Sequence, residues 1–179
     1  SKANAGQQSD IWELAANFVQ KFGDVNVGVY GAYAWADLEA QTGFGKDQKQ
    51  WGIGAQLSAW GFTVGAHYKH DNNGIQSGDY DSWGAGLSYK WDAWTVGAEY
   101  GWVKAKAYTT ATGALTGVKD RTWLAQFGVQ YAGIGPGINT FAGIQFFDMN
   151  GASAAAGNAS GAGQGNDGTV FIIGTTITY

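Results

Sequence analysis

The chain has 179 residues and a formal net charge of −4; 30 residues are glycine and only 13% are charged. It contains no cysteine, which excludes a disulfide framework and any thiolate site. The small negative charge offers no basic surface for nucleic acid, so we expect no nucleic-acid partner.

Composition and hydropathy together favour strands over helices. Aromatic residues make up 15% of the chain, yet its mean hydropathy of −0.20 is close to neutral. No apolar run approaches the ~18 residues that a membrane-spanning helix needs. These totals fit strands with one apolar and one polar face, because aromatic residues favour strands and glycine disfavours helices. The opening "SKANAGQQSD" lacks the regions of a signal peptide, so we expect that a leader was removed or that the chain starts inside something larger.

Period-two alternation predicts about nine strands and no helix. In residues 25–35, for example, Val25 and Val27 share one face, while Asn26 and Gly28 share the other. The expected strands cover residues 10–22, 25–35, 50–59, 62–71, 81–91, 94–106, 119–132, 137–149 and 169–179. We therefore expect an all-β chain.

The strands are expected to form a repeated hairpin. The segment "WGIGAQLSAWGFTVGAHY" begins at Trp51, and the similar "WGAGLSYKWDAWTVGAEY" begins at Trp83. The connections alternate in length, which predicts short turns near residues 23–24, 60–61, 92–93 and 133–136, and long loops near residues 41–49, 72–80, 108–118 and 150–168. Short turns on one side and long loops on the other are typical of outer-membrane barrels.

Aromatic rings stand at both ends of the apolar face of several expected strands. Trp83 and Trp91 bracket one strand, and Trp94 and Trp102 bracket the next. Their even spacing puts both rings of a strand on one face. Eight steps of ~3.3 Å, tilted by ~40°, give ~20 Å of height, close to the ~25 Å apolar band of a membrane barrel. A soluble sandwich also explains the alternation, but its core would place the largest residues centrally, and a glycine-rich solenoid would explain only part of the chain.

The number and composition of the strands bear on the size of the barrel. Bacterial single-chain barrels have an even number of strands, so a count of nine predicts an incomplete one. The faces opposite the rings are rich in glycine and alanine, which are too small to fill a narrow barrel and suit the wall of a wide, wet one. We expect residues 1–179 to form a single β-barrel domain, or the carboxyl-terminal portion of one, with no second domain.

The two hairpin segments and the closing stretch "TVFIIGTTITY" resemble the Gram-negative general diffusion porins. The resemblance implies a transmembrane antiparallel up-and-down β-barrel in the bacterial outer membrane, of which this chain would supply the last nine of sixteen strands. It further implies a homotrimer and passive diffusion of small hydrophilic solutes and ions. The family's carboxyl-terminal signal, which the barrel-assembly machinery reads, would correspond to Phe171, Ile173, Ile177 and Tyr179.

Candidate functional residues lie opposite the expected lipid face, where charged side chains in a lumen bias ion selectivity. The charges there have mixed signs, so no selectivity is predicted. The expected channel-lining residues are Glu13, Asn17, Lys21, Tyr30, Gln56, His67, Lys69, Asp71, Glu99, Gln126, Gln130 and Gln145.

A group of cations is expected just above the outer row of rings. Lys104, Lys106, Lys119 and Arg121 share the outward parity and flank a single loop. They could contact lipopolysaccharide phosphates, with the guanidinium as a bidentate donor. The simpler alternative is that they snorkel at the lipid interface.

Catalysis and cofactors are not expected. His67 and His70 are three residues apart on one expected strand and so on opposite faces, which prevents them from binding one metal together. Asp71, Asp79 and Asp81 offer hard oxygen ligands for Ca²⁺ in an extracellular loop, although their spacing matches no recognised calcium loop. The rival function is a small closed barrel that acts as a membrane anchor or adhesin through its loops, and an outer-membrane enzyme is a third.

Overall fold

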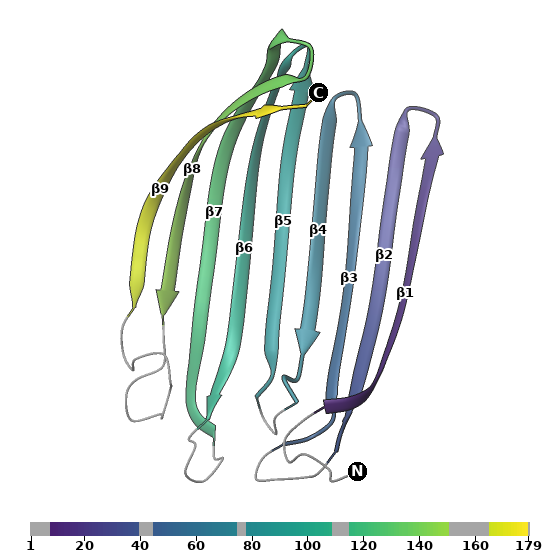
Figure 1. Cartoon of the computed structure of the whole chain (residues 1–179), viewed down its shortest axis with the longest axis vertical. Coiled ribbons are helices and arrows are strands. Elements are labelled where there is room, and N and C mark those ends of the chain that lie inside the picture. Colours follow the sequence, from purple (N-terminus) through teal and green to yellow (C-terminus); the bar gives the residue numbers. More distant parts are fainter. Residues whose placement is uncertain (1–7, 40–44, 75–77, 109–114, 151–164, 179) are drawn as a thin grey trace.

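The computed structural model describes residues 8–39, 45–74, 78–108, 115–150 and 165–178, with the backbone alone for residues 107–108 and 115–119. They form one antiparallel sheet of nine strands, in which each strand pairs with the next one along the chain (Figure 1). The strands are β1 (Gln8–Phe22), β2 (Val25–Leu38), β3 (Gln48–Ala59), β4 (Phe62–Asp71), β5 (Tyr80–Trp91), β6 (Trp94–Tyr108), β7 (Leu115–Gly135), β8 (Ile138–Asn150) and β9 (Asn166–Ile177). The described residues contain no helix that is long and apolar enough to cross a membrane. The all-β, up-and-down prediction is confirmed.

The largest difference from the predicted strand bounds is at β7. This strand was expected over residues 119–132, but it runs from Leu115 to Gly135. At its start, the backbone of Leu115 pairs with Tyr108 beyond a register shift in the ladder with β6. At its end, a second irregularity lies between Tyr131 and Gly135 in the ladder with β8. Such irregularities break the alternation on which the prediction rested.

Tight turns join the strands at one edge of the sheet, and the longer connections lie at the other edge (Figure 1). In the β3–β4 turn, Trp60 and Gly61 both have positive φ, of 51° and 85°, which is the type I′ geometry favoured in two-residue hairpins. The expected turn at residues 133–136 is instead centred on Pro136 and Gly137. Proline presets the first central position, and Gly137 supplies the positive φ of 73° at the second.

The described part of the chain has almost no hydrophobic core. Ala36 is the one apolar residue in it that is buried, whereas large side chains such as Leu14, Phe18 and Ile53 are more than half exposed. The described residues form a single layer, so no second sheet covers either face. A sheet that exposes this much apolar surface needs an apolar surrounding on that side.

Aromatic rings form two rows on one face of the sheet, which we call the outer face. Near the long connections, ring centroids lie 5.8 Å apart for Trp12 and Trp35, and 5.2 Å apart for Trp51 and Tyr68. The same row continues through contacts of Tyr100 with the rings of β5 and β7. Near the tight turns, a second row includes the contacts Phe62–Tyr89 at 4.3 Å and Trp94–Tyr131 at 4.5 Å. Rings thus flank the outer face on both sides, as the spacing predicts.

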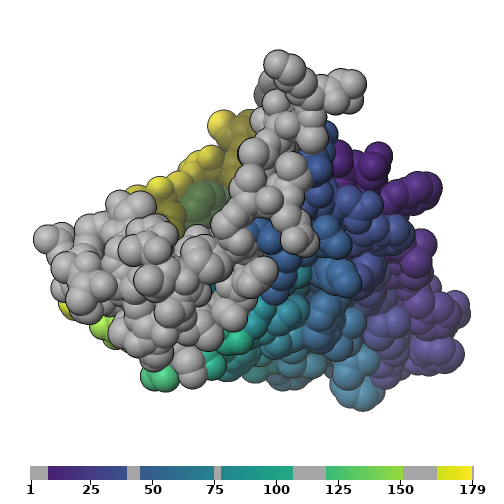
Figure 2. Space-filling model, turned by 90° about the horizontal axis from the view of Figure 1, so that it is seen from below, coloured from purple at the N-terminus to yellow at the C-terminus, as the bar shows by residue number. Residues whose placement is uncertain are grey.

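The sheet is curved but not closed. Seen from the edge with the long connections, the strands follow an arc from β1 to β9 (Figure 2). No ladder joins β1 to β9 within the described residues. Both strands therefore present a free edge.

Candidate functional site

The face opposite the two rows of rings, which we call the inner face, carries small and polar side chains. The ladders place every predicted channel-lining residue on this face, because directly paired residues share a face. Asn17 lies opposite Tyr30, for example, and Gln126 lies between Glu99 and Gln145 on the neighbouring strands. Whether these side chains line a channel stays a prediction.

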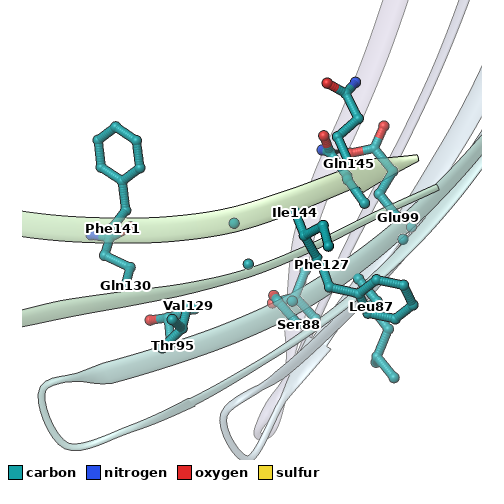
Figure 3. A pocket seen from close by; sticks show the side chains of 18 of the residues that line it. Leu87, Ser88, Thr95, Glu99, Phe127, Val129, Gln130, Phe141, Ile144 and Gln145 are labelled. Atoms are coloured by element: carbon teal, nitrogen blue, oxygen red, sulfur yellow. Dashed lines mark hydrogen bonds between the residues drawn. The ribbon is translucent and has the colours of Figure 1, made fainter. Parts of the chain in front are cut away.

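A hollow of about 630 Å³ occupies part of the inner face, in the bend of the sheet (Figure 3). Glu99, Phe141 and Gln145 project into it, whereas Leu87 and Phe127 project from the other side of the ribbons. The predicted residues that line the hollow are Gln56, His67, Glu99, Gln126, Gln130 and Gln145. The others lie elsewhere on the inner face: Glu13, Asn17, Lys21, Tyr30, Lys69 and Asp71.

Bulky inner-face side chains lie over glycines of the neighbouring strand. A Cβ added at Gly54 would collide with the ring of Tyr30, and one at Gly84 would lie 2.6 Å from Cε1 of His67. The ladders pair Tyr30 with Gly54 and His67 with Gly84. Because the glycine leaves room, each ring lies flat against the sheet and projects little from the inner face.

Two acidic side chains of the inner face, Glu99 and Asp71, accept hydrogen bonds. Glu99 accepts a hydrogen bond from Nε2 of Gln126 at 3.1 Å. Asp71 is only 6% exposed and accepts hydrogen bonds from the Asn73 amide and the Gln48 side chain. Glu99 is the one acidic side chain among the residues that line the hollow.

A cluster of ion pairs, which the sequence did not predict, links two of the long connections to the end of β6. Asp79 pairs with Lys46, at 3.8 Å, and with Lys106. The hydrogen bond from Lys106 holds the pKa of the Asp79 carboxyl below its usual value of 3.8. The backbone adds bonds from the Lys46 amide to Gly74 and from the Lys106 amide to Asp79. We call Lys46, Asp79 and Lys106 the loop latch. Alternation within strands carries no signal for it, because Lys46 and Asp79 come from two separate connections and Lys106 from the end of β6.

The predicted lipopolysaccharide-contacting cations lie partly together. Lys104 is directly opposite Arg121 on the outer face, and the backbone of Lys106 pairs with that of Lys119. The ammonium of Lys106 is engaged in the loop latch, and the side chain of Lys119 lies outside the described residues. Lys104 and Arg121 are therefore the pair whose arrangement the structure describes.

The carboxylates considered for Ca²⁺ have separate partners. Asp71 faces inward beside Lys69, Asp79 belongs to the loop latch, and Asp81 accepts hydrogen bonds on the outer face. Within the described ranges, no three His, Cys, Asp or Glu side chains are grouped as metal ligands. Calcium binding stays a prediction without a described site.

The ladders place His67 on the inner face and His70 on the outer face. His70 lies opposite Trp51, and its Nδ1 is 2.7 Å from an Asp81 oxygen that also accepts a hydrogen bond from Tyr68. The two imidazoles therefore cannot meet at one metal or one substrate.

The described members of the predicted carboxyl-terminal signal share the outer face of β9. Phe171 and Ile173 are 79% and 87% exposed, and Ile177 is 64% exposed. Tyr179 lies outside the described residues. Their role in assembly stays a prediction.

Comparisons with known proteins agree with this geometry. A search of curated proteins found no match. Among solved structures, the chain is similar to the crystal structure of OccAB4 from Acinetobacter baumannii, with a TM-score of 0.57 and 14% sequence identity. The match covers 92% of this chain and 45% of that chain, so the sequence spans less than half of its solved relative. The family model for the Gram-negative porins matches residues 1–152. The chain therefore belongs to the Gram-negative porin family.

Proposed function

We propose that the chain forms part of the wall of a water-filled pore through which small hydrophilic solutes and ions diffuse passively. The pore would lie in the bacterial outer membrane and act without catalysing a reaction. The family membership supports a porin of that membrane, and the passive mechanism is our inference from the two faces of the sheet.

The observation that carries the proposal is the contrast between these faces in a sheet without a core. Within the described residues, one apolar side chain is buried, and the outer face exposes its aromatic and aliphatic residues. Hydrocarbon on the outer side removes this surface from water, while the polar inner side stays hydrated. A soluble protein would have to cover the outer face with another layer.

The rival function, a small filled barrel that acts as an anchor or adhesin, fits the inner face less well. A filled barrel needs bulky side chains that interdigitate across its interior. The inner face instead has a row of directly paired glycines, Gly97, Gly128 and Gly143. Such a face favours a lumen wide enough to hold water.

Closure of the barrel is the second part of the proposal. In lipid, every backbone polar group must find a partner, so spanning sheets close on themselves. The free edges of β1 and β9 would thus pair with further strands, for which we propose a total of sixteen. The 45% coverage of the OccAB4 chain is compatible with a barrel roughly twice this size.

The proposed partners belong to the outer membrane. Lys104 and Arg121 would contact lipopolysaccharide phosphates, and the outward residues of β9 would be read by the barrel-assembly machinery. Three copies would associate, a prediction that the mass of the detergent-solubilised particle tests.

Single-channel recording in planar bilayers tests the pore directly. The full-length protein should give large, steady conductance steps that scale with salt concentration, because ions cross a wet lumen. Protein that inserts but stays electrically silent would contradict the pore and favour the anchor.

A further inference from the structure

The hollow on the inner face contains a groove whose floor is made of glycine. The floor runs across three strands through Gly97, Gly128 and Gly143, which are directly opposite one another in the ladders. Ser88 follows at one end of the floor and Ile172 at the other. The groove therefore crosses the strands of β6, β7 and β8 rather than following them.

Hydrogen-bonding side chains stand on both sides of this floor. One wall is Glu99, Gln126 and Gln145, and the other is Thr95, Gln130 and Phe141; in each wall the residues are directly paired across β6, β7 and β8. All of these residues line the hollow. The two walls are four residue steps apart along each strand, which is roughly 13 Å at ~3.3 Å per residue.

Backbone sterics do not require glycine at the centre of the floor. A Cβ at Gly128 would make an ordinary contact, 3.5 Å from the carbonyl oxygen of Ala142, and φ at this residue is not positive. This differs from Gly54 and Gly84, which lie beneath the rings of inner-face residues. Glycine weakens a strand interior and often marks a bulge, a tight bend, or a site where a ligand or another backbone approaches closely. No register shift lies at Gly128, so a bend or a ligand remains as the reason for glycine there.

The two walls offer hydrogen-bond donors, hydrogen-bond acceptors and the face of one aromatic ring, that of Phe141. Side-chain amides both donate and accept, as the hydroxyl groups of a polyol do. The hydrogen bond from Gln126 to Glu99 orients both side chains and leaves the other carboxylate oxygen free to accept. Phe141 is 38% exposed, and its ring is placed over Gly174, where an added Cβ would lie 2.5 Å from its Cζ. An apolar C–H face of a sugar ring can pack on such a surface.

The charges of the lining residues favour neutral ligands over anionic ones. Glu99 is the one acidic group of the lining, and the lining contains no lysine or arginine. An anionic solute would meet the Glu99 carboxylate and no lysine or arginine side chain to offset it. The volume of about 630 Å³ is within the ~300–1,000 Å³ range of small-molecule sites.

We propose that this groove is a binding site for neutral polyhydroxylated solutes of saccharide type. The glycine floor lets the solute approach the backbone closely. The glutamines and Glu99 form hydrogen bonds with its hydroxyl groups, and the ring of Phe141 packs against one face of a sugar ring. The inference rests on the pore function proposed above, within which the groove would slow and select the solutes that pass.

Maltose binding to the full-length protein in detergent tests the groove without requiring conductance. Saturation-transfer NMR should detect saturable binding of maltose, and weaker binding of the anionic glucose 6-phosphate. Gly128→Val fills the floor and should weaken maltose binding at least tenfold. The matched control is Gly28→Val, since Gly28 is an inner-face residue of β2 outside the hollow, with nothing within 4 Å of an added Cβ.

Two further variants leave the floor unchanged and so keep the test valid if Gly128→Val fails to fold. Gln126→Leu and Gln145→Leu each remove wall hydrogen bonds and should weaken maltose binding roughly three- to tenfold. Absence of saturable maltose binding, or equal losses in the Gly28→Val control, would overturn the groove. A protein that binds maltose but does not conduct would contradict the pore alone, and one that conducts but does not bind maltose would contradict the groove alone.

Discussion

Glycines of the inner face differ in what surrounds them, and the difference predicts the effect of replacing each. Gly54 lies beneath the ring of Tyr30, whereas Gly28 has no atom within 4 Å of an added Cβ. Gly54→Ala should force the ring out of its position and lower stability by about 1–3 kcal/mol. Gly28→Ala should be neutral or slightly stabilising, because alanine loses less backbone entropy on folding. Urea unfolding in detergent micelles measures both, and equal stabilities would contradict the proposed packing of Tyr30.

A second prediction at the scale of single residues concerns ion preference. Glu99 is the one carboxylate of the hollow, so it should attract cations into the lumen. Glu99→Gln should shift the reversal potential in a salt gradient toward anions, whereas Glu99→Asp keeps the charge and should leave the sign of the preference unchanged. The same reversal potential in Glu99→Gln and the unchanged protein would show that this carboxylate lies outside the conducting path.

Among the elements, the strands and the alternation of short and long connections could be predicted, but the contacts between the long connections could not. Alternation identifies a strand such as β4, which spans the expected residues Phe62–Asp71, because only one side chain in two meets the apolar side. It fails at the ends of β7, where register shifts interrupt the period. The loop latch depends on residues that meet only after β3, β4, β5 and β6 have paired in sequence. The predicted channel-lining face followed from parity, but the glycine floor required the register between strands, which one sequence does not contain.

The loop latch gives a prediction at the scale of the connections. The pKa of Asp79 is lowered by its hydrogen bond from Lys106. Its contribution to stability is therefore fully present above pH 3.8, the unperturbed value, and is lost as the pH falls through the lower folded value. Hydrogen exchange at the Lys46 and Lys106 amides should accelerate, relative to the intrinsic rate, across that acidic window.

The variant Asp79→Asn separates the loop latch from other carboxylates that titrate at similar pH. Asparagine keeps the shape of the side chain but cannot form the ion pair. The variant should exchange faster at pH 5, with a smaller change on acidification. If the unchanged protein and the variant respond identically, Asp79 does not hold the connections together.

At the scale of the whole molecule, the two faces of the sheet suit two different surroundings, lipid on the outer face and water on the inner face. Its described residues bury almost no apolar side chain, and its rows of rings flank a face of aliphatic residues. Burial of that face in lipid would replace the missing core, since apolar surface removed from water contributes about 25 cal/mol per Å². In the closed barrel proposed above, the free edges of β1 and β9 would also find backbone partners.

Cysteine labelling in isolated outer membranes tests the division between lipid and water most directly. The chain has no native cysteine, and Gln126 and Phe127 are neighbours on opposite faces of β7. With a small water-soluble maleimide, Gln126→Cys should react readily and Phe127→Cys should stay unlabelled until the membrane is dissolved and the protein unfolded. The same contrast is expected between Gln56→Cys and Ala55→Cys on β3. Ready labelling of the outer-face cysteines in intact membranes, or protection of the inner-face ones, would contradict the account.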